Sequence, residues 1–396
     1  MPAPSKDPIP SRPRRPKLLF LVTEDWYFWS HRLPMARAAR DAGFDVAVAA
    51  RMTDHRAAIE AEGFRVHPLS WRRRSRAPAE LKAIAEIAAL YRRERPDIVH
   101  HVALKPVVFG SLAARFAGRP AMVNALTGLG YVFTATSLRA RVIRAILSAV
   151  LRVLVDRPNG RVVLQNPDDL SLLVGRGISR ARARLVPGSG VDIRRFAPLP
   201  PPETDAEAGA VTCAVVSRML TIKGVPVAVA AVREARRQGA PLHLLLAGVP
   251  DPESHAAISR ADLESWDKDP GITWLGHVAD VREVWARAHL AVQPSLGGEG
   301  IPKSLLEAAA CGRPIVATDV PGCREIVRPG ENGDLVPPGD PAALAAALAA
   351  LAGDAERRRR YGAESRRRVE TDLSAEAVGH RIVAIYRELL GAAPRR

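Results

Sequence analysis

The sequence has few cysteines, few aromatic residues and no long uncharged apolar run. Its three cysteines form no Cys-x-x-Cys pair and none lies at ligand spacing from a histidine, which argues against a disulfide framework and a zinc site. We interpret them as buried apolar residues in a reducing compartment. Aromatic residues make up only 5%, so the 47% of apolar residues is mainly Ala, Leu and Val. That composition favours helices and buried parallel strands over a β-sandwich.

Two kinds of membrane-directing segment are missing. No apolar stretch approaches the roughly 20 residues that a spanning helix needs. The beginning of the chain, MPAPSKDPIPSRPRRPK, has no apolar core, so we do not expect a secretory signal and interpret residues 1–16 as a disordered tail. The sequence therefore predicts a cytoplasmic protein.

The charge of the chain is unevenly distributed. The net charge is +16, but residues 1–195 hold 34 Lys and Arg against 16 Asp and Glu, whereas the remaining residues hold 24 against 26. A basic N-terminal half indicates an anionic partner, which is a lipid surface, a phosphorylated substrate or a nucleic acid. Nucleic acid is disfavoured because the basic clusters lack interleaved aromatic residues and no binding motif is present.

Two basic clusters are candidates for contact with a membrane. One is the segment SWRRRSR, and the other is the helical, partly apolar stretch 138–157. A basic amphipathic helix can lie in the interface of an anionic bilayer, so we predict peripheral attachment to the inner face of the plasma membrane. The alternative is a core helix with solvated arginines. The predicted membrane-facing residues are Arg72, Arg73, Arg74, Arg76, Arg141, Arg144 and Arg152.

Short apolar runs alternate with helix-period segments through both halves of the chain. Apolar runs such as KLLFLVT and LHLLLAG are separated by helical stretches, a pattern typical of parallel sheets covered by helices. We predict an α/β protein of two doubly wound, Rossmann-like domains facing a cleft. Their predicted bounds are residues 17–196 for an acceptor-binding domain, 197–210 for a linker, 211–373 for a donor-binding domain and 374–396 for a helix packing back on the first domain.

The stretch 294–327 is the most informative for chemistry. A strand ends at Pro294, a glycine-rich loop carries Glu299, and Pro302 opens a helix. The free N–H groups at the start of that helix form a natural site for a phosphate. Glu307 lies further along the helix, where its carboxylate can accept hydrogen bonds from the hydroxyls of a ribose.

A second cationic turn lies upstream, in SRMLTIKG. Arg218 and Lys223 flank a short turn between the first strand of the second domain and a helix. A guanidinium and an ammonium at the carboxyl edge of a parallel sheet suit a diphosphate.

These segments resemble glycosyltransferase family 4, whose members have the GT-B fold. The resemblance includes the two glutamates Glu299 and Glu307 followed by ACGRPIVATD, and the preceding RMLTIKG. The stretches HHVALKPVVFGSLAARFAG, NALTGLGYVF, PGSGVDIRRF and WLGHVADV are similar to its branch of capsule and lipid-linked-oligosaccharide transferases. Many independent motifs in the right order spread the resemblance over roughly residues 17–390.

The resemblance implies roles for the residues of the second domain. Arg218 and Lys223 contact the donor diphosphate, Glu307 the ribose, and Glu299 the transferred sugar. The family retains anomeric configuration and generally needs no metal or cofactor beyond the sugar nucleotide. Negative charge develops on the leaving diphosphate, so stabilising it is the main expected contribution to catalysis. The backbone expected to hold the sugar and its phosphate is that of Gly300, Ile301, Pro302, Lys303, Ser304 and Leu305.

The resemblance also implies a histidine just after the fourth strand of the first domain. Both His100 and His101 fall there, and we favour His101 as the catalytic residue, with His100 in the acceptor site. Lys105 is expected to bind an acceptor phosphate. Thr127 and Gly128 are expected to line the cleft. The first loop, residues 23–32, lacks the glycine pair seen in many relatives.

The sequence therefore predicts a retaining glycosyltransferase that moves a sugar from a nucleoside diphosphate, expected to be UDP, to a polyprenyl-diphosphate-linked saccharide. One alternative is a nucleotide-sugar 2-epimerase of the same fold, which the basic, apolar first domain and the motif order disfavour. Another is a non-catalytic membrane scaffold, which has no use for a diphosphate clamp.

Overall fold

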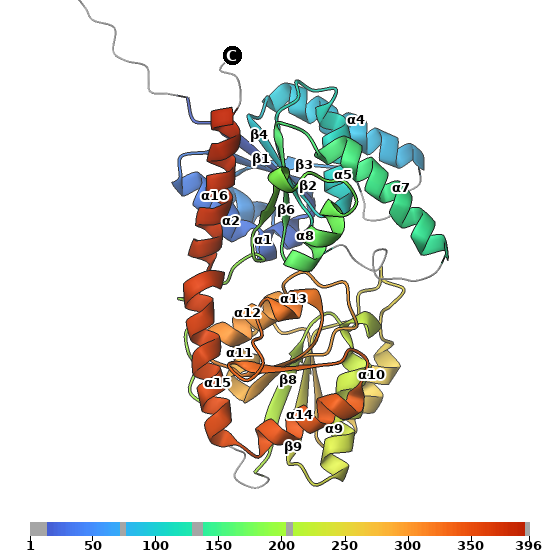
Figure 1. Cartoon of the computed structure of the whole chain (residues 1–396), viewed down its shortest axis with the longest axis vertical. Coiled ribbons are helices and arrows are strands. Elements are labelled where there is room, and N and C mark those ends of the chain that lie inside the picture. Colours follow the sequence, from blue (N-terminus) through green and yellow to red (C-terminus); the bar gives the residue numbers. More distant parts are fainter. Residues whose placement is uncertain (1–13, 72–76, 129–137, 203–208, 393–396) are drawn as a thin grey trace, which may run out of the picture.

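The computed structural model describes residues 14–71, 77–128, 138–202 and 209–392. Two α/β domains lie one above the other, and two C-terminal helices, α15 (Ala355–Arg368) and α16 (Ala375–Ala392), run beside the second and the first domain (Figure 1). The predicted fold class is confirmed, because each domain has one parallel sheet in doubly wound order. The predicted membrane cluster Arg72, Arg73, Arg74 and Arg76 lies outside the described residues.

The first domain has a seven-stranded parallel sheet in the order β3-β2-β1-β4-β5-β6-β7. Its strands are β1 (Lys17–Glu24), β2 (Asp45–Arg51), β3 (Arg65–Pro68), β4 (Ile98–Val102), β5 (Ala121–Ala125), β6 (Gly160–Leu164) and β7 (Ala183–Leu185). Its helices are α1 (Asp25–His31), α2 (Leu33–Asp41), α3 (Arg56–Ala61), α4 (Ala77–Glu94), α5 (Leu104–Ala114), α7 (Leu138–Val155) and α8 (Pro167–Val174).

The second domain has a six-stranded parallel sheet in the order β10-β9-β8-β11-β12-β13. Its strands are β8 (Val211–Val216), β9 (Leu242–Ala247), β10 (Ile272–Gly276), β11 (Leu290–Gln293), β12 (Ile315–Thr318) and β13 (Gly333–Val336). Its helices are α9 (Val225–Arg237), α10 (Arg260–Asp267), α11 (Arg282–Arg287), α12 (Lys303–Ala310), α13 (Pro321–Arg324), α14 (Pro341–Ala352) and α15 (Ala355–Arg368).

Each sheet is covered on both faces, as its apolar strands require. In the first domain, α1, α2 and the C-terminal helix α16 (Ala375–Ala392) cover one face, and α4 and α5 cover the other. In the second, α9 and α14 cover one face, and α11 and α12 cover the other. The loops at the carboxyl ends of the strands face the other domain.

The structure differs from the sequence-based expectation in two places. Residues 23–32, expected to be a loop, contain the helix α1, and Asp25 fixes its start because its carboxylate accepts hydrogen bonds from the backbone N–H groups of Thr53 and His55. The edge strands β3, β7 and β13 were not predicted. They are only three or four residues long, and RVHP, ARL and GDLV have too few apolar residues to give a periodic signal.

The chain crosses between the domains twice, and the two crossings are paired. The Val191 N–H donates to the Leu373 carbonyl at 3.1 Å, and the Ala375 N–H donates to the Val191 carbonyl at 2.8 Å. Beyond this point α16 packs against α2 and contributes apolar residues, including Ile382 and Tyr386, to the core of the first domain. The last helix of the chain is therefore an integral part of the first domain.

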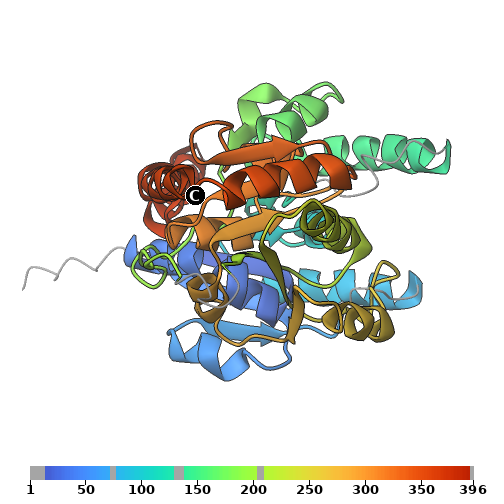
Figure 2. The same cartoon turned by 90° about the horizontal axis from the view of Figure 1, so that it is seen from below.

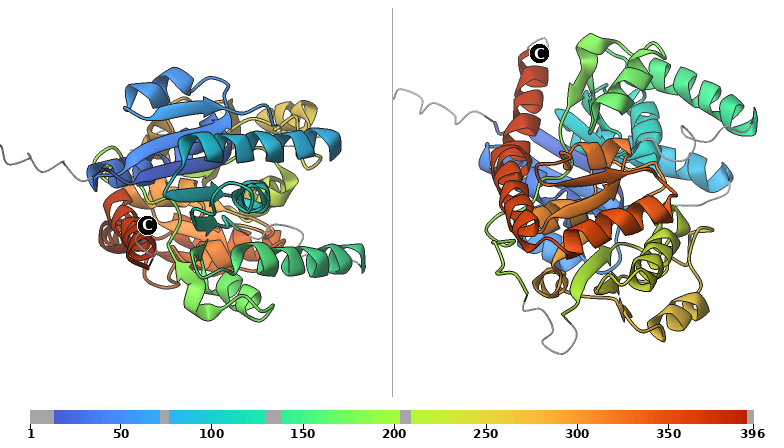
Figure 3. Two further views of the ribbon diagram at one scale, coloured as in Figure 1. Left: turned by 90° about the horizontal axis from the view of Figure 1, so that it is seen from above. Right: turned by 60° about the horizontal axis from the view of Figure 1, so that its bottom comes forward.

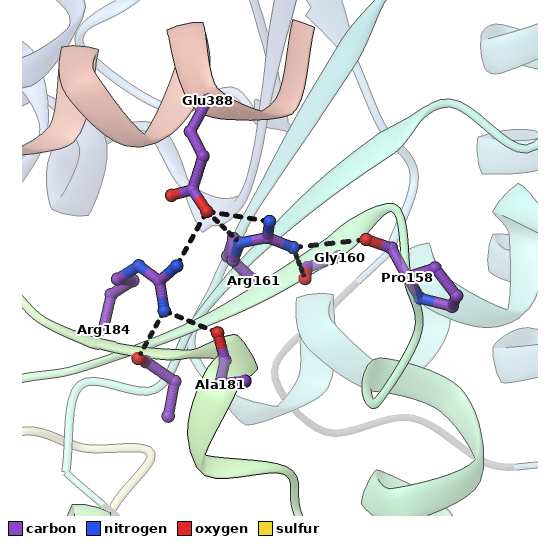
Figure 4. Close-up of polar contacts among 7 residues, drawn as sticks. Pro158, Gly160, Arg161, Ala181, Arg184 and Glu388 are labelled. Carbon is purple, nitrogen blue, oxygen red and sulfur yellow. Dashed lines mark hydrogen bonds and ion pairs between the residues drawn. The ribbon is translucent and has the colours of Figure 1, made fainter. Parts of the chain in front are cut away.

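An ion-pair cluster fastens the end of α16 to two strands of the first domain (Figure 4). One carboxylate oxygen of Glu388 accepts from Arg161 at 2.8 Å and from Arg184 at 2.7 Å. Partial burial acts to raise the pKa of Glu388, but the hydrogen bonds from the two arginines outweigh it and lower the pKa. The cluster therefore stabilises the folded chain when Glu388 is ionised.

We predict that Glu388→Gln lowers the free energy of unfolding by about 1 kcal/mol at neutral pH, the upper range for a partly exposed ion pair. Because the folded-state pKa is lowered, this contribution is present above the unfolded-state pKa of about 4.3 and is lost as the pH falls through the folded-state value. Urea denaturation as a function of pH measures it. The control is Glu264→Gln, which removes only a local pair with Arg260 in α10. Equal losses in both variants would contradict the prediction.

Candidate active site

The first element of the site is the turn between β8 and α9. Gly224 has φ +73°, and a Cβ atom there would lie 1.7 Å from the Pro294 carbonyl oxygen. Only glycine permits this approach, which brings the turn against the loop that follows β11. Lys223 and the loop that carries Glu299 are therefore held together by backbone packing.

The Glu299 carboxylate is held by a cation and a hydroxyl. Its Oε1 lies 2.6 Å from Lys223 Nζ and accepts a hydrogen bond from Ser295 Oγ, also at 2.6 Å. Ser295 in turn accepts from the Gln293 amide at 2.7 Å, and Ser304 Oγ donates to the other end of that amide at 3.1 Å. The chain of bonds links the end of β11, the glycine-rich loop and α12.

The helix α12 begins directly after this loop. Pro302 is its N-cap residue in an extended conformation, and no side chain caps the helix. The first N–H groups of α12 therefore have no side-chain acceptor and are suited to bind an anionic ligand. This is the position at which the sequence predicted the phosphate site of Lys303, Ser304 and Leu305.

Glu307 lies one turn into α12 and is 5% exposed. Burial raises the pKa of Glu307, and the charge of Lys303 acts in the opposite direction. Lys303 Nζ lies 2.9 Å from Glu307 Oε1. The carboxylate thus has one cationic partner and borders a groove. In this position it can accept hydrogen bonds from the hydroxyl groups of a ligand in the groove.

Arg218 lies at the same sheet edge but is more exposed. Its Nη1 lies 2.6 Å from Asp251 Oδ2, and 45% of its side chain is exposed. The structure thus places Arg218 on the β8–α9 turn with Lys223, paired to an aspartate that the sequence analysis did not single out.

The first domain contacts the glycine-rich loop directly. Gln165 Oε1 accepts a hydrogen bond from the Ile301 N–H at 2.7 Å. A Cβ atom on Gly300 would lie 2.7 Å from the Thr127 carbonyl oxygen, and one on Gly128 would lie 2.8 Å from the Gly300 nitrogen. The predicted cleft residues Thr127 and Gly128 therefore pack on the loop that carries Glu299.

The structure contradicts the assignment of His101 as a catalytic residue. His101 is 0% exposed and faces α4 and α5. Its Nδ1 is 2.7 Å from Asn124 Oδ1 and its Nε2 is 3.0 Å from the Tyr91 hydroxyl, so both ring nitrogens are engaged. Burial lowers the pKa of His101 to about 4. The sequence could not show this, because two adjacent strand residues point to opposite faces and either could have faced the cleft.

His100 points to the opposite face of β4 and is also fully buried. It stacks on Phe20, and its Nδ1 lies 2.5 Å from the Tyr386 hydroxyl of α16. Direct contact of His100 with an acceptor, as predicted, is therefore not compatible with this conformation. Lys105, at the start of α5, pairs with Glu80 of α4 at 3.3 Å.

A groove of about 1260 Å³ lies between the domains. Lys303 and Glu307 line one side of it, and Trp26 and Trp29 of α1 line the other. The sequence analysis did not predict that Trp26 and Trp29 line the groove, because residues 23–32 lack the glycine pair that marks this loop in many relatives. Further lining residues that it missed are His55, Arg195 and His277.

His31, which the sequence gave no reason to select, lies near the same cations. Burial, together with the charges of Lys303, Arg32 and Lys223, lowers the pKa of His31 to about 3. Its Nδ1 lies 2.6 Å from Ser30 Oγ, and its ring stacks on Tyr27. His31 is therefore a neutral group facing a cationic site across the domain boundary.

Comparison with known proteins identifies both halves of the chain. A family described as glycosyl transferases group 1 matches residues 210–354, and one described as glycosyl transferase 4-like matches residues 17–156. The chain is 22% identical over 315 residues to N,N'-diacetylbacillosaminyl-diphospho-undecaprenol alpha-1,3-N-acetylgalactosaminyltransferase of Campylobacter jejuni, covering 76% of this chain and 80% of that protein. It is 22% identical over 325 residues to the capsular polysaccharide biosynthesis glycosyltransferase CapM of Staphylococcus aureus, covering 79% and 82%.

Other curated relatives, 31–42% identical, match over shorter segments, and the chain covers only 13%, 35% and 50% of their lengths. Among solved structures, HepE of Anabaena in complex with UDP and glucose superposes with a TM-score of 0.76 at 17% identity, covering 94% of this chain and 100% of that one. This likeness shows the GT-B arrangement of two parallel-sheet domains. Since the two family matches fall on the two domains, the chain belongs to the group 1, family 4-like glycosyltransferases and is a glycosyltransferase of the GT-B fold.

Proposed function

We propose that the enzyme transfers a sugar, with retention of configuration, from a UDP-sugar to a lipid-diphosphate-linked saccharide during synthesis of a surface polysaccharide. The observation that carries the donor half of the proposal is the convergence of Lys223, Glu299 and the uncapped start of α12 at one sheet edge. Glu307 lies about one turn further along α12, where its carboxylate can accept hydrogen bonds from the ribose of the proposed donor.

The proposed mechanism rests on stabilising the leaving group. The bond from the anomeric carbon to the donor phosphate breaks while the acceptor hydroxyl oxygen bonds to the same face of the sugar, and the hydroxyl proton passes to the departing phosphate oxygen. Lys223 is paired with Glu299, and a bound diphosphate offers it a second anion. Together with Arg218 and the N–H groups of α12, it supplies positive charge where negative charge develops, so the proposed reaction needs no metal.

Relatives support the acceptor and donor classes. The name of the C. jejuni protein specifies a diphospho-undecaprenol substrate, and that of CapM specifies capsular polysaccharide biosynthesis. HepE was crystallised with UDP and glucose. In the proposed acceptor site, Thr127 and Gly128 border the donor loop, and Lys105 is available near the start of α5 for an acceptor phosphate once its pair with Glu80 opens.

The first domain has a surface suited to a membrane. No helix in the described part of the chain is long and apolar enough to span a bilayer. However, α4 and α7 project to the same side of the molecule, away from α16 (Figures 2 and 3). Ile146 and Val153 of α7 are 61% and 60% exposed, whereas Leu151 and Leu154 of the same helix are buried in the core.

This exposed face of α7 is both apolar and basic. Arg141 and Arg152 are exposed on the same helix, and Arg144 is partly exposed. Leu81, on the other projecting helix α4, is 69% exposed. We propose that α7 lies in the membrane interface and brings the domain to its lipid-linked acceptor.

Lys223→Ala and Glu307→Ala are each predicted to reduce turnover at least tenfold, because one removes a diphosphate contact and the other a ribose contact. Affinity for UDP, measured by calorimetry, is expected to fall in both variants. The matched controls are Lys268→Ala and Glu264→Ala, which remove exposed side chains of the same types at and after the end of α10. Near wild-type rates and UDP affinities in both site variants would refute the donor-site assignment.

Membrane attachment is predicted to depend on the charge of α7. Replacing Arg141, Arg144 and Arg152 together by Gln should weaken binding to phosphatidylglycerol vesicles on the order of 100-fold, since each cation contributes about 1 kcal/mol near an anionic surface. Vesicle sedimentation at low and high salt measures this, and binding should weaken with salt.

The control carries the same charge change on exposed arginines of the second domain, namely Arg233, Arg237 and Arg260. Equal sedimentation of both triple variants with the vesicles would exclude the proposed membrane surface. Vesicle binding that does not depend on anionic lipid or on salt would exclude it as well.

A further inference from the structure

A buried arginine of the first domain has no acidic partner among the described residues. Arg32, just before α2, is 2% exposed. The one hydrogen bond of its side chain to a described residue joins Nη1 to the sulfur of Met35 at 3.5 Å, and its Nε has no partner there. In the described part of the chain no carboxylate forms an ion pair with it. Because a guanidinium stays charged and an unpaired buried charge is strongly unfavourable, the site requires an anion.

Arg32 borders a small internal cavity. The cavity has a volume of about 10 Å³, and His100, Gln165, Gly188 and Ile382 also line it. His100 Nε2 is buried and has no partner among the described residues. A volume of this size holds a single water molecule or monatomic ion.

The polar groups at the cavity are hydrogen-bond donors. Tyr386 is neutral because burial raises the pKa of its hydroxyl, so the hydroxyl can donate to His100 Nδ1, 2.5 Å away. In that tautomer the proton of His100 lies on Nε2. Gln165 uses its carbonyl oxygen to accept from Ile301, which leaves its NH₂ group as a donor. Burial lowers the pKa of His100 far enough to keep the ring neutral, so Arg32 supplies the single positive charge.

We propose that this cavity is a binding site for one halide ion, chloride under ordinary conditions. The cavity has three hydrogen-bond donors, one net positive charge and room for one ion. These properties are complementary to a monatomic anion. A water molecule satisfies the donors but leaves the charge of Arg32 unbalanced. The ion would be held by Arg32, His100 and Gln165.

The site has a structural consequence for the domain contact. Gln165 holds the Ile301 N–H, and a Cβ atom on Gly188 would lie 3.1 Å from that of Ile301. An ion that fixes the Gln165 amide therefore fixes the start of α12 from the side of the first domain. Resting on the proposed function, we expect chloride to lower KM for the donor sugar more than it changes kcat.

The direct test is anomalous scattering from crystals of the full chain grown or soaked in bromide. We expect a bromide peak in the cavity between Arg32 and His100. Density for water alone in the cavity, with bromide bound elsewhere, would overturn the proposal. This readout needs neither donor nor acceptor, so its result is independent of the assigned activity.

A second test uses thermal unfolding in chloride or gluconate at equal ionic strength. The wild type is expected to gain about 2 °C or more in chloride, saturably, because the ion binds only the folded state. Arg32→Met should lose this gain and should unfold in gluconate no earlier than the wild type, since it removes an unpaired buried charge.

The control is Arg40→Met on the same helix, whose side chain is 38% exposed and pairs with Asp41. It should keep the chloride response. A third arm replaces chloride by inorganic phosphate or by UDP. An Arg32-dependent gain with phosphate or UDP but none with chloride would overturn the halide assignment and identify Arg32 as a substrate contact. Loss of UDP binding with an intact chloride response would instead refute only the donor site.

Discussion

The close contact between the carboxyl edges of the two sheets is the constraint on which the site depends. Gly128 and Gly300 pack backbone against backbone across the boundary, and a Cβ atom on Gly322 would lie 1.6 Å from the Gly300 carbonyl oxygen. The Ile301 N–H reaches Gln165 in the opposite domain. Because side chains are absent at these points, the loop that carries Glu299 is fixed by backbone on both sides, and its carboxylate can be positioned precisely enough to hold Lys223.

The cationic residues of the two domains differ in how they are paired. The cations of the proposed donor site have carboxylate partners, Glu299 for Lys223 and Glu307 for Lys303, so in the proposed reaction a diphosphate competes with these carboxylates. The excess of basic residues lies instead in the first domain, including the projecting helix α7. In the proposed reaction, a soluble donor and an acceptor in a membrane approach from different sides of one cleft, and α15 and α16 run beside the second and the first domain (Figure 1).

The proximity of the candidate residues in the second domain could be predicted because they are local in sequence. Glu299, the helix start and Glu307 lie within one loop and one helix, so their spacing alone placed them together. The first domain was harder. His101 faces α5 rather than the cleft, because the face of a central strand depends on the helices that cover it. His31 and the unpaired Arg32 come from a segment without a recognisable motif, and their environment is created by α12 and α16, far away in the chain.

The sequence by itself determined the fold class, the proximity of the candidate donor-site residues and the uneven charge. Apolar periodicity, the positions of glycine and proline, and composition are all local properties of the chain. Only the tertiary structure decided which histidine is enclosed, which partner each cation has, and that a buried arginine lies without a carboxylate beside the domain contact. The physical reason is that burial and charge pairing depend on residues brought together from distant segments. Tyr386 beside His100 and Ile301 beside Gln165 are contacts that no local pattern contains.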